Sequence, residues 1–62
     1  MSDQKILAIV TLEKERVAGG SPIFVVDNRE ELERQAFTLE KILDAMVHEV
    51  APTTFILVRH SD

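Results

Sequence analysis

The chain has 62 residues, no cysteine and a formal net charge of −4. A chain this short forms one domain near the lower size limit for a core without a disulfide or metal, and lacking cysteine it has no disulfide framework or thiolate zinc site. There is no clustered Lys and Arg for nucleic acid, and no long apolar segment or signal-peptide core for a membrane or secretion. We therefore expect one cytoplasmic α+β domain over residues 1–62, with no bound metal or cofactor.

Two strands and a long loop are predicted in the first half of the chain. Lys5 to Leu12 is apolar and rich in β-branched residues, which predicts a strand. Glu13 to Pro22 is charged and then contains Gly19 and Gly20, which accept positive φ at no cost, so this segment predicts a mobile loop. Ile23 to Val26 predicts a second, shorter strand.

A helix start follows the second strand. Asp27 with Glu30 and Asn28 with Glu31 form two overlapping signals, each with the three-residue spacing of a capping box. Either of the two pairs can begin the helix at about Arg29.

The spacing of apolar residues after this start predicts one long helix. They recur at intervals of three and four, which places them on one helical face. The helix should end near His48 or the residue after it, because Pro52 disfavours helical geometry in the residue before it. The predicted apolar face consists of Leu32, Ala36, Leu39, Leu43, Met46 and Val50, with Ile42 widening it.

Thr53 to Val58 predicts the last strand, so the expected fold is α+β with the order β-β-α-β. Three strands then form a mixed sheet with one helix on one face. The last two strands are joined through the helix, and we expect them to be parallel with a right-handed crossover. The first strand is the longest and most apolar, which favours a central position, antiparallel to both neighbours, and the order 2-1-3. The order in sequence stays open.

Both faces of this predicted sheet are apolar, although one helix covers only one face. Alternate residues of a strand point to opposite faces, so the first strand sends Ile6, Ala8 and Val10 one way and Leu7 and Ile9 the other. A large apolar patch is rarely left open on a soluble monomer. We therefore expect a second protein or a second copy to cover the open side, since the loop with Val17 has too few apolar residues to do so. The partner-binding residues predicted there are Leu7, Ile9, Ile23, Val25, Ile56 and Val58.

Phe37 is a further candidate for a partner contact. At 100° per residue it falls on the back of the predicted helix, away from Leu39. One exposed Phe is common, yet buried aromatic residues often dominate the energy of an interface.

No motif for catalysis meets the structural context that it requires. Gly19 and Gly20 with Ser21 precede a strand, whereas a phosphate-binding loop precedes a helix. His48, at the end of the predicted helix, and His60, near the helix start together with Arg59, should lie at opposite ends of the domain and cannot share a metal. A non-enzymatic protein is therefore expected.

Four segments also carry a family resemblance: ILAIV in the first strand, the glycine pair and Pro22 before the second, AFTLEKILDAMVHEV along the helix, and ILVRH at the end. Their most specific parts are Asp44 to His48 and Val58 to His60. The chain resembles a family of small proteins found in endospore-forming bacteria. This family is described as the capping complex subunit for the YIEGIA-type sporulation membrane protein. The resemblance implies a cytoplasmic accessory protein that acts in sporulation through a protein complex.

Three functions remain open at this point. The first is a non-catalytic interaction module that docks on a protein partner. The second is a homodimeric regulatory domain that binds a small ligand, with its site near Gly19, Gly20 and Ser21. The third is a small enzyme that depends on His48 or His60.

Overall fold

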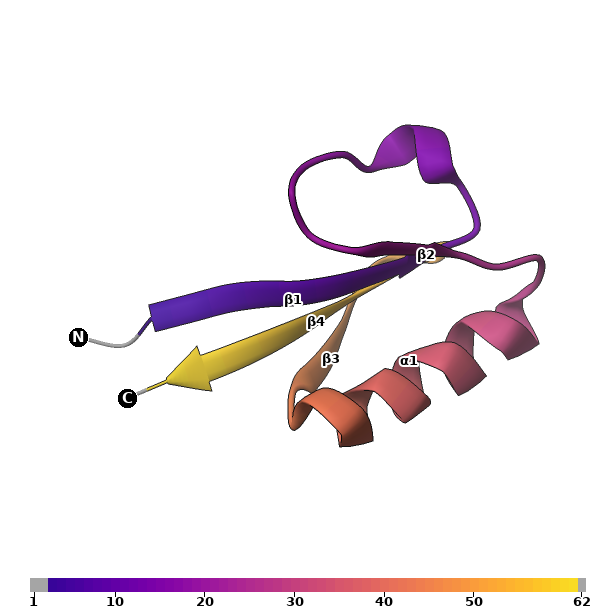
Figure 1. Cartoon of the computed structure of the whole chain (residues 1–62). Helices are drawn as coiled ribbons and strands as arrows, with labels where there is room; N and C mark the ends of the chain where they lie inside the picture. Colours follow the sequence, from indigo (N-terminus) through magenta and orange to yellow (C-terminus); the bar gives the residue numbers. More distant parts are fainter. Residues whose placement is uncertain (1–2, 62) are drawn as a thin grey trace.

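A computed structural model of the chain describes residues 3–61, and the side chains of residues 5–59. In chain order the elements are β1 (Asp3–Thr11), the 3-10 turn η1 (Lys14–Arg16), β2 (Ile23–Val25), α1 (Arg29–Leu43), β3 (Met46–Ala51) and β4 (Thr54–Ser61). The strands form one sheet in the order β2-β1-β4-β3. Figure 1 shows α1 on one side of this sheet and the loop that carries η1 on the other. The predicted α+β class is confirmed, and β1 is central as expected.

The sheet has four strands, where three were predicted, because the helix is shorter than its apolar spacing suggested. It ends at Leu43, and Asp44 takes the left-handed conformation with φ 53° and ψ 50°. Asp tolerates this conformation because its short side chain can bond locally, and such a residue closes many helices. The backbone N–H of Ala45 then donates to the carbonyl of Glu40 at 3.1 Å. The chain turns back from there as β3, so the prediction that Met46 and Val50 lie on the helix was wrong.

The strand directions also differ from the prediction. β2 runs parallel to β1, not antiparallel to it. Parallel neighbours need a crossover of about a dozen residues, and residues 12–22 provide it on one face of the sheet. α1 crosses the other face and joins β2 at one edge to β3 at the opposite edge. β4 is antiparallel to β1 and to β3. Because β2 is parallel to β1, β2 and β4 run in opposite directions, and the expectation that the second and last strands run parallel was wrong.

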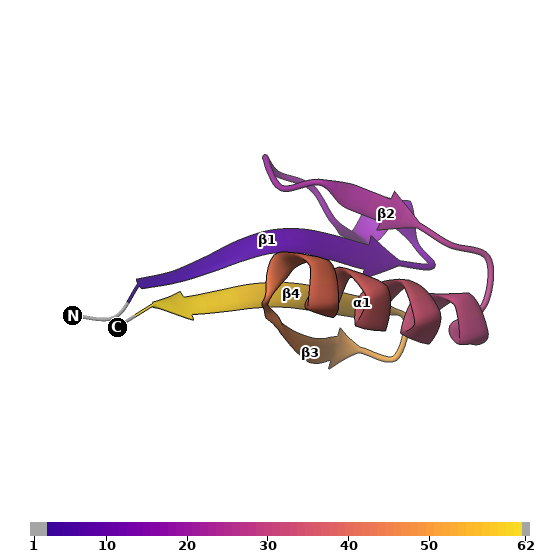
Figure 2. The ribbon, with the colours of Figure 1, turned by 60° about the horizontal axis from the view of Figure 1, so that its bottom comes forward.

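The main core lies between α1 and the sheet. α1 packs against β1, β4 and β3, as Figure 2 shows. Leu32, Ala36 and Leu39 are buried on the inner side of the helix, as their spacing predicted. Their buried neighbours in the core are Ala8, Val10, Ala45, Phe55 and Leu57.

A β-bulge in β1 changes which side chains share a face. Ile6 pairs with Val58 while Ala8 pairs with Leu57, so Leu7 is an extra residue in the ladder. The bulge moves Ile6 to the side of the sheet opposite Ala8. Leu7 packs instead against the core beneath α1. Strict alternation had placed Leu7 on the open side with Ile9, and this part of the prediction was wrong.

The helix side of the core yields a first testable prediction. Replacing Leu32 by Ala removes a side chain with no exposed surface and leaves a cavity. We expect the free energy of unfolding to fall by about 2–5 kcal/mol, measured by urea denaturation followed by circular dichroism.

Ile42→Ala is the matched control, because Ile42 is 70% exposed although its position suggested that it widens the apolar face. We expect a change of about 0.5 kcal/mol or less. Equal losses in the two variants would contradict this assignment of the inner face of α1.

Candidate interaction surface

The side of the sheet opposite α1 carries apolar residues from all four strands. Residues paired directly across two strands share a face, so the register identifies this side row by row. One row holds Met46, Val58 and Ile6, the next His48, Ile56, Ile9 and Ile23, and the third Ala51, Thr54, Thr11 and Val25. We call the residues of these three rows the open face. It is apolar except for two threonines and one histidine.

The predicted partner-binding residues do not all lie on this face. The structure brings together Ile9, Ile23, Val25, Ile56 and Val58 there. Leu7 lies on the helix side, as described above. Phe37 is on α1, on the other side of the sheet, and is 53% exposed. A flat partner on the open face therefore does not contact Phe37.

Two large apolar residues of the open face were missed by the sequence reasoning. Ile6 reaches it through the bulge and is 45% exposed, and Met46 reaches it because residues 46–51 form a strand. No local signal in the sequence indicates the bulge. The four-residue spacing of Met46 and Val50 fits one side of a strand, but it fits one face of a helix equally well.

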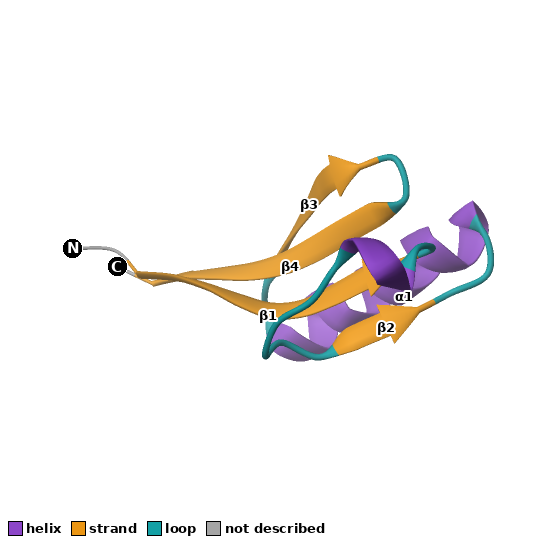
Figure 3. Ribbon diagram, turned by 90° about the horizontal axis from the view of Figure 1, so that it is seen from above, coloured by secondary structure: helices purple, strands orange, loops and turns teal. Residues whose placement is uncertain are grey.

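The loop over β1 covers part of the open face. Figure 3 shows η1 and its loop in front of β1, with α1 behind the sheet. Ile9 is only 8% exposed, whereas Val25 at the β2 edge is 53% exposed. The loop thus shields the centre of the face and leaves its margins accessible.

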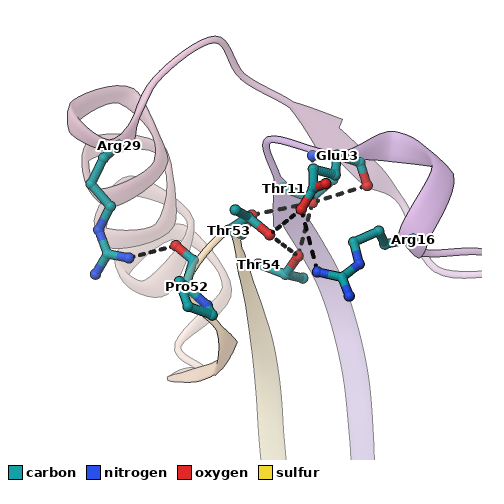
Figure 4. Close-up of polar contacts among 7 residues, drawn as sticks. All are labelled: Thr11, Glu13, Arg16, Arg29, Pro52, Thr53 and Thr54. Atoms are coloured by element: carbon teal, nitrogen blue, oxygen red, sulfur yellow. Dashed lines mark hydrogen bonds and ion pairs between the residues drawn. The ribbon is translucent and has the colours of Figure 1, made fainter.

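A network of hydroxyl groups holds the start of this loop, as Figure 4 shows. The Thr11 hydroxyl accepts a hydrogen bond from the backbone N–H of Glu13 at 3.0 Å and lies 2.9 Å from the hydroxyl of Thr54. Thr53 donates its hydroxyl proton to the Glu13 carboxylate at 2.8 Å. Arg16 forms an ion pair with the same carboxylate at 3.4 Å. The network ties the loop to the turn between β3 and β4.

The other end of the loop is tied to β1. The Ser21 hydroxyl donates to the carbonyl of Ile6 at 3.1 Å, and the backbone N–H of Ile9 donates to the carbonyl of Pro22 at 2.9 Å. Gly19 has φ 126°, a conformation that side-chain-bearing residues rarely adopt. Ser21 therefore fixes the end of the crossover to β1, and Gly19 allows the backbone to turn within it.

Charged side chains lie at both ends of α1. Arg29 donates to the carboxylate of Glu33 at 3.1 Å, to that of Glu49 at 3.3 Å and to the carbonyl of Pro52 at 2.6 Å, and its guanidinium lies 5.1 Å from the centre of the Phe55 ring. The hydrogen bond with Glu33, followed by that with Glu49, raises the pKa of Arg29. These contacts join the helix start to the β3–β4 turn.

Arg59 lies at the opposite end of the helix from the one predicted. Its guanidinium donates to the carbonyl of Leu43 at 3.1 Å, so it stabilises the C-terminus of α1. The reason is that the β3–β4 hairpin makes β4 run in the same direction as α1. His48 is correspondingly on β3 and not at a helix end, while the side chain of His60 lies outside the described residues.

No group of three or more His, Cys, Asp or Glu side chains within the described part of the chain is arranged to hold a metal ion. In the same residues, no helix is long and apolar enough to cross a membrane.

The fold and the open face define a small α+β protein with an apolar sheet surface. A model of the family described as "Capping complex subunit for YIEGIA" matches residues 3–60, and the chain belongs to this family. The resemblance inferred from the sequence is thereby confirmed. The uncharacterized protein YpzH of Bacillus subtilis (strain 168) is 38% identical over 55 residues, which cover 89% of this chain and 86% of that protein. No solved structure matches the chain significantly.

The hydroxyl network yields a second prediction. Thr11→Val keeps the shape of a fully buried side chain but removes the hydroxyl that bonds Glu13 and Thr54. Because it leaves buried polar groups without a partner, we expect the free energy of unfolding to fall by about 1–3 kcal/mol. Urea denaturation measures this change.

Thr38→Val on the exposed surface of α1 is the control, with an expected change of about 0.5 kcal/mol or less. A Thr11 variant as stable as the control would show that the network does not hold the loop.

Proposed function

We propose that this chain is a non-catalytic accessory subunit that binds a protein partner through its open face. The family description, a capping complex subunit, supports a role within a protein assembly. In this proposal the chain acts as a single domain in the cytoplasm, the complex belongs to sporulation, and the YIEGIA protein of the family description is the first partner to test.

The observation that carries the proposal is the continuity of apolar side chains across the sheet. Met46, Val58 and Ile6 lie side by side on three adjacent strands. Met46 is 56% exposed, and Ile6 is also accessible. Fully burying a side chain of this size contributes about 1.5–3 kcal/mol, from which the cost of association must be subtracted. A partner that covers this row gains a favourable apolar contact.

The polar groups of the open face support binding over catalysis. Thr11 and Thr54 are buried, and their hydroxyls bond to each other. Neither hydroxyl is therefore presented to a substrate as a nucleophile. His48 is exposed on the edge strand β3. It lies in the row of Ile56, whereas the two threonines lie in the next row.

A third prediction tests the open face against the outer surface of α1. Val25→Glu and Phe37→Glu form a matched pair, because each replaces an apolar side chain that is 53% exposed. We expect Val25→Glu to weaken binding to the YIEGIA protein by roughly tenfold or more, since a charge would have to be desolvated at the contact. Phe37→Glu should bind like the parent chain. Isothermal titration with the purified partner measures both affinities.

The reverse result, with only Phe37→Glu weakened, would transfer the contact to α1. Met46→Glu tests the row that carries the proposal, because Met46 is 56% exposed. If Val25→Glu and Met46→Glu both bind as tightly as the parent chain, the open face is refuted as the contact surface. Ile9 is less suitable for this test, because a charge at a buried position would also unfold the chain.

A further inference from the structure

The crossover loop, residues 12–22, shields the centre of the open face with few apolar side chains. Thr11 and Ile9 are buried on this face, although α1 lies on the other side of the sheet. Leu12 packs against the helix-side core, no residue of η1 is buried, and Val17 beyond it is half-buried. Apolar packing therefore contributes little to holding the loop in place.

Polar bonds hold the two ends of the crossover loop. At its start the Thr53 hydroxyl donates to the Glu13 carboxylate, and at its end the Ser21 hydroxyl donates to the carbonyl of Ile6. In between, a Cβ atom added at Gly20 would meet no atom within 4 Å beyond its chain neighbours. The loop is thus tied at its ends and clear of the rest of the chain at its glycine pair.

The crossover loop is also longer than the gap that it bridges. It joins Thr11 of β1 to Ile23 of β2, and Ile23 is paired with Ile9, close to Thr11 on the same strand. At about 3.3 Å per residue along a strand and about 4.8 Å between strands, Thr11 and Ile23 lie about 8 Å apart. Residues 12–22 could span roughly 36 Å if extended. The loop can therefore leave the face while β1 and β2 stay paired.

We propose that the crossover loop is a movable strap, which lifts off the open face of the folded chain and lets an apolar ligand surface reach Ile9, Ile23 and Ile56. These residues lie in one row of the face, and all three are at least partly shielded when the strap is closed. The proposal deepens the proposed function and rests on it for the identity of the partner. The lifting of the strap is a property of the chain alone.

A strap and a contact loop have opposite effects on affinity. When only open chains bind, the apparent affinity is reduced to the fraction of chains that are open. A change that weakens the closed state then raises the affinity of the open face for its ligand. If the loop were part of the contact surface, the same change would lower the affinity.

The dye ANS, which binds exposed apolar surface, tests the strap without any partner. Thr53→Val removes the hydroxyl that bonds Glu13, and Ser21→Ala removes the one that bonds Ile6. We expect each variant to bind the dye about three- to tenfold more tightly than the parent chain, measured by fluorescence titration. Thr38→Val on the exposed surface of α1 is the matched control and should bind like the parent chain.

Two further measurements locate the effect, under conditions in which circular dichroism shows every variant folded. Ala36→Gly weakens α1 on the other side of the sheet, because Ala36 is buried there and glycine disfavours a helix. This variant should leave dye binding unchanged. Methyl NMR signals of Ile9 and Ile56 should shift when the dye is added to Thr53→Val, whereas those of Leu32, in the helix-side core, should not.

Dye binding no tighter in Thr53→Val and Ser21→Ala than in Thr38→Val would overturn the proposal. An equal gain in Ala36→Gly would also overturn it, because the dye would then report a general loosening. Isothermal titration with the YIEGIA protein should show Thr53→Val binding more tightly by the same factor as the dye, and weaker binding would make the loop a contact instead of a strap. A parent chain that does not bind the YIEGIA protein would refute the proposed function, while the dye titration would still decide whether the strap opens.

Discussion

The central constraint of this structure is that β1 is apolar on both of its faces and must be covered twice. Val10 faces α1, and Ile9 faces the opposite side, yet both are buried. A chain of 62 residues has room for one helix. It covers the second face with the crossover between β1 and β2, which passes over the sheet where a helix would pass in a larger protein. The hydroxyl network of Thr11 and Thr54 fixes this thin cover at its start.

The parallel pairing of β1 and β2 follows from the same constraint. An antiparallel hairpin would leave the connection at the end of the sheet and the second face uncovered. The parallel arrangement carries the connection back along β1, so residues 12–22 lie over the face. The length of this segment was a signal for a crossover, because hairpin loops are usually two to five residues long. The sequence interpretation took the charged, glycine-rich segment as a mobile loop and did not use its length, and it chose the wrong direction for β2.

Features that depend on local chemistry were predictable. The Asn28 side chain accepts a hydrogen bond from the backbone N–H of Glu31 at 2.9 Å. The Glu31 carboxylate in turn accepts one from the backbone N–H of Asp27. Of the two predicted helix starts, the pair Asn28 and Glu31 is therefore confirmed. The inner residues of α1 and the two-sided apolar pattern of the strands were likewise evident from spacing. Features that depend on a distant part of the chain were not. The sequence of residues 46–51 is compatible with both a helix and a strand. These residues form a strand because they pair with β4, which lies beside them only in the folded chain.

The bulge at Leu7 is a second feature that depends on distant contacts, and it has consequences for function. It gives the helix-side core one more apolar side chain and transfers Ile6 to the open face, where Val58 and Met46 complete a row. The same local irregularity thus strengthens the covered side and enlarges the uncovered one. A ligand that binds only the folded chain stabilises it by mass action. Since the cover on the open side is thin, a partner on this row would add to the stability of the sheet itself, and binding of such a partner would be thermodynamically linked to folding.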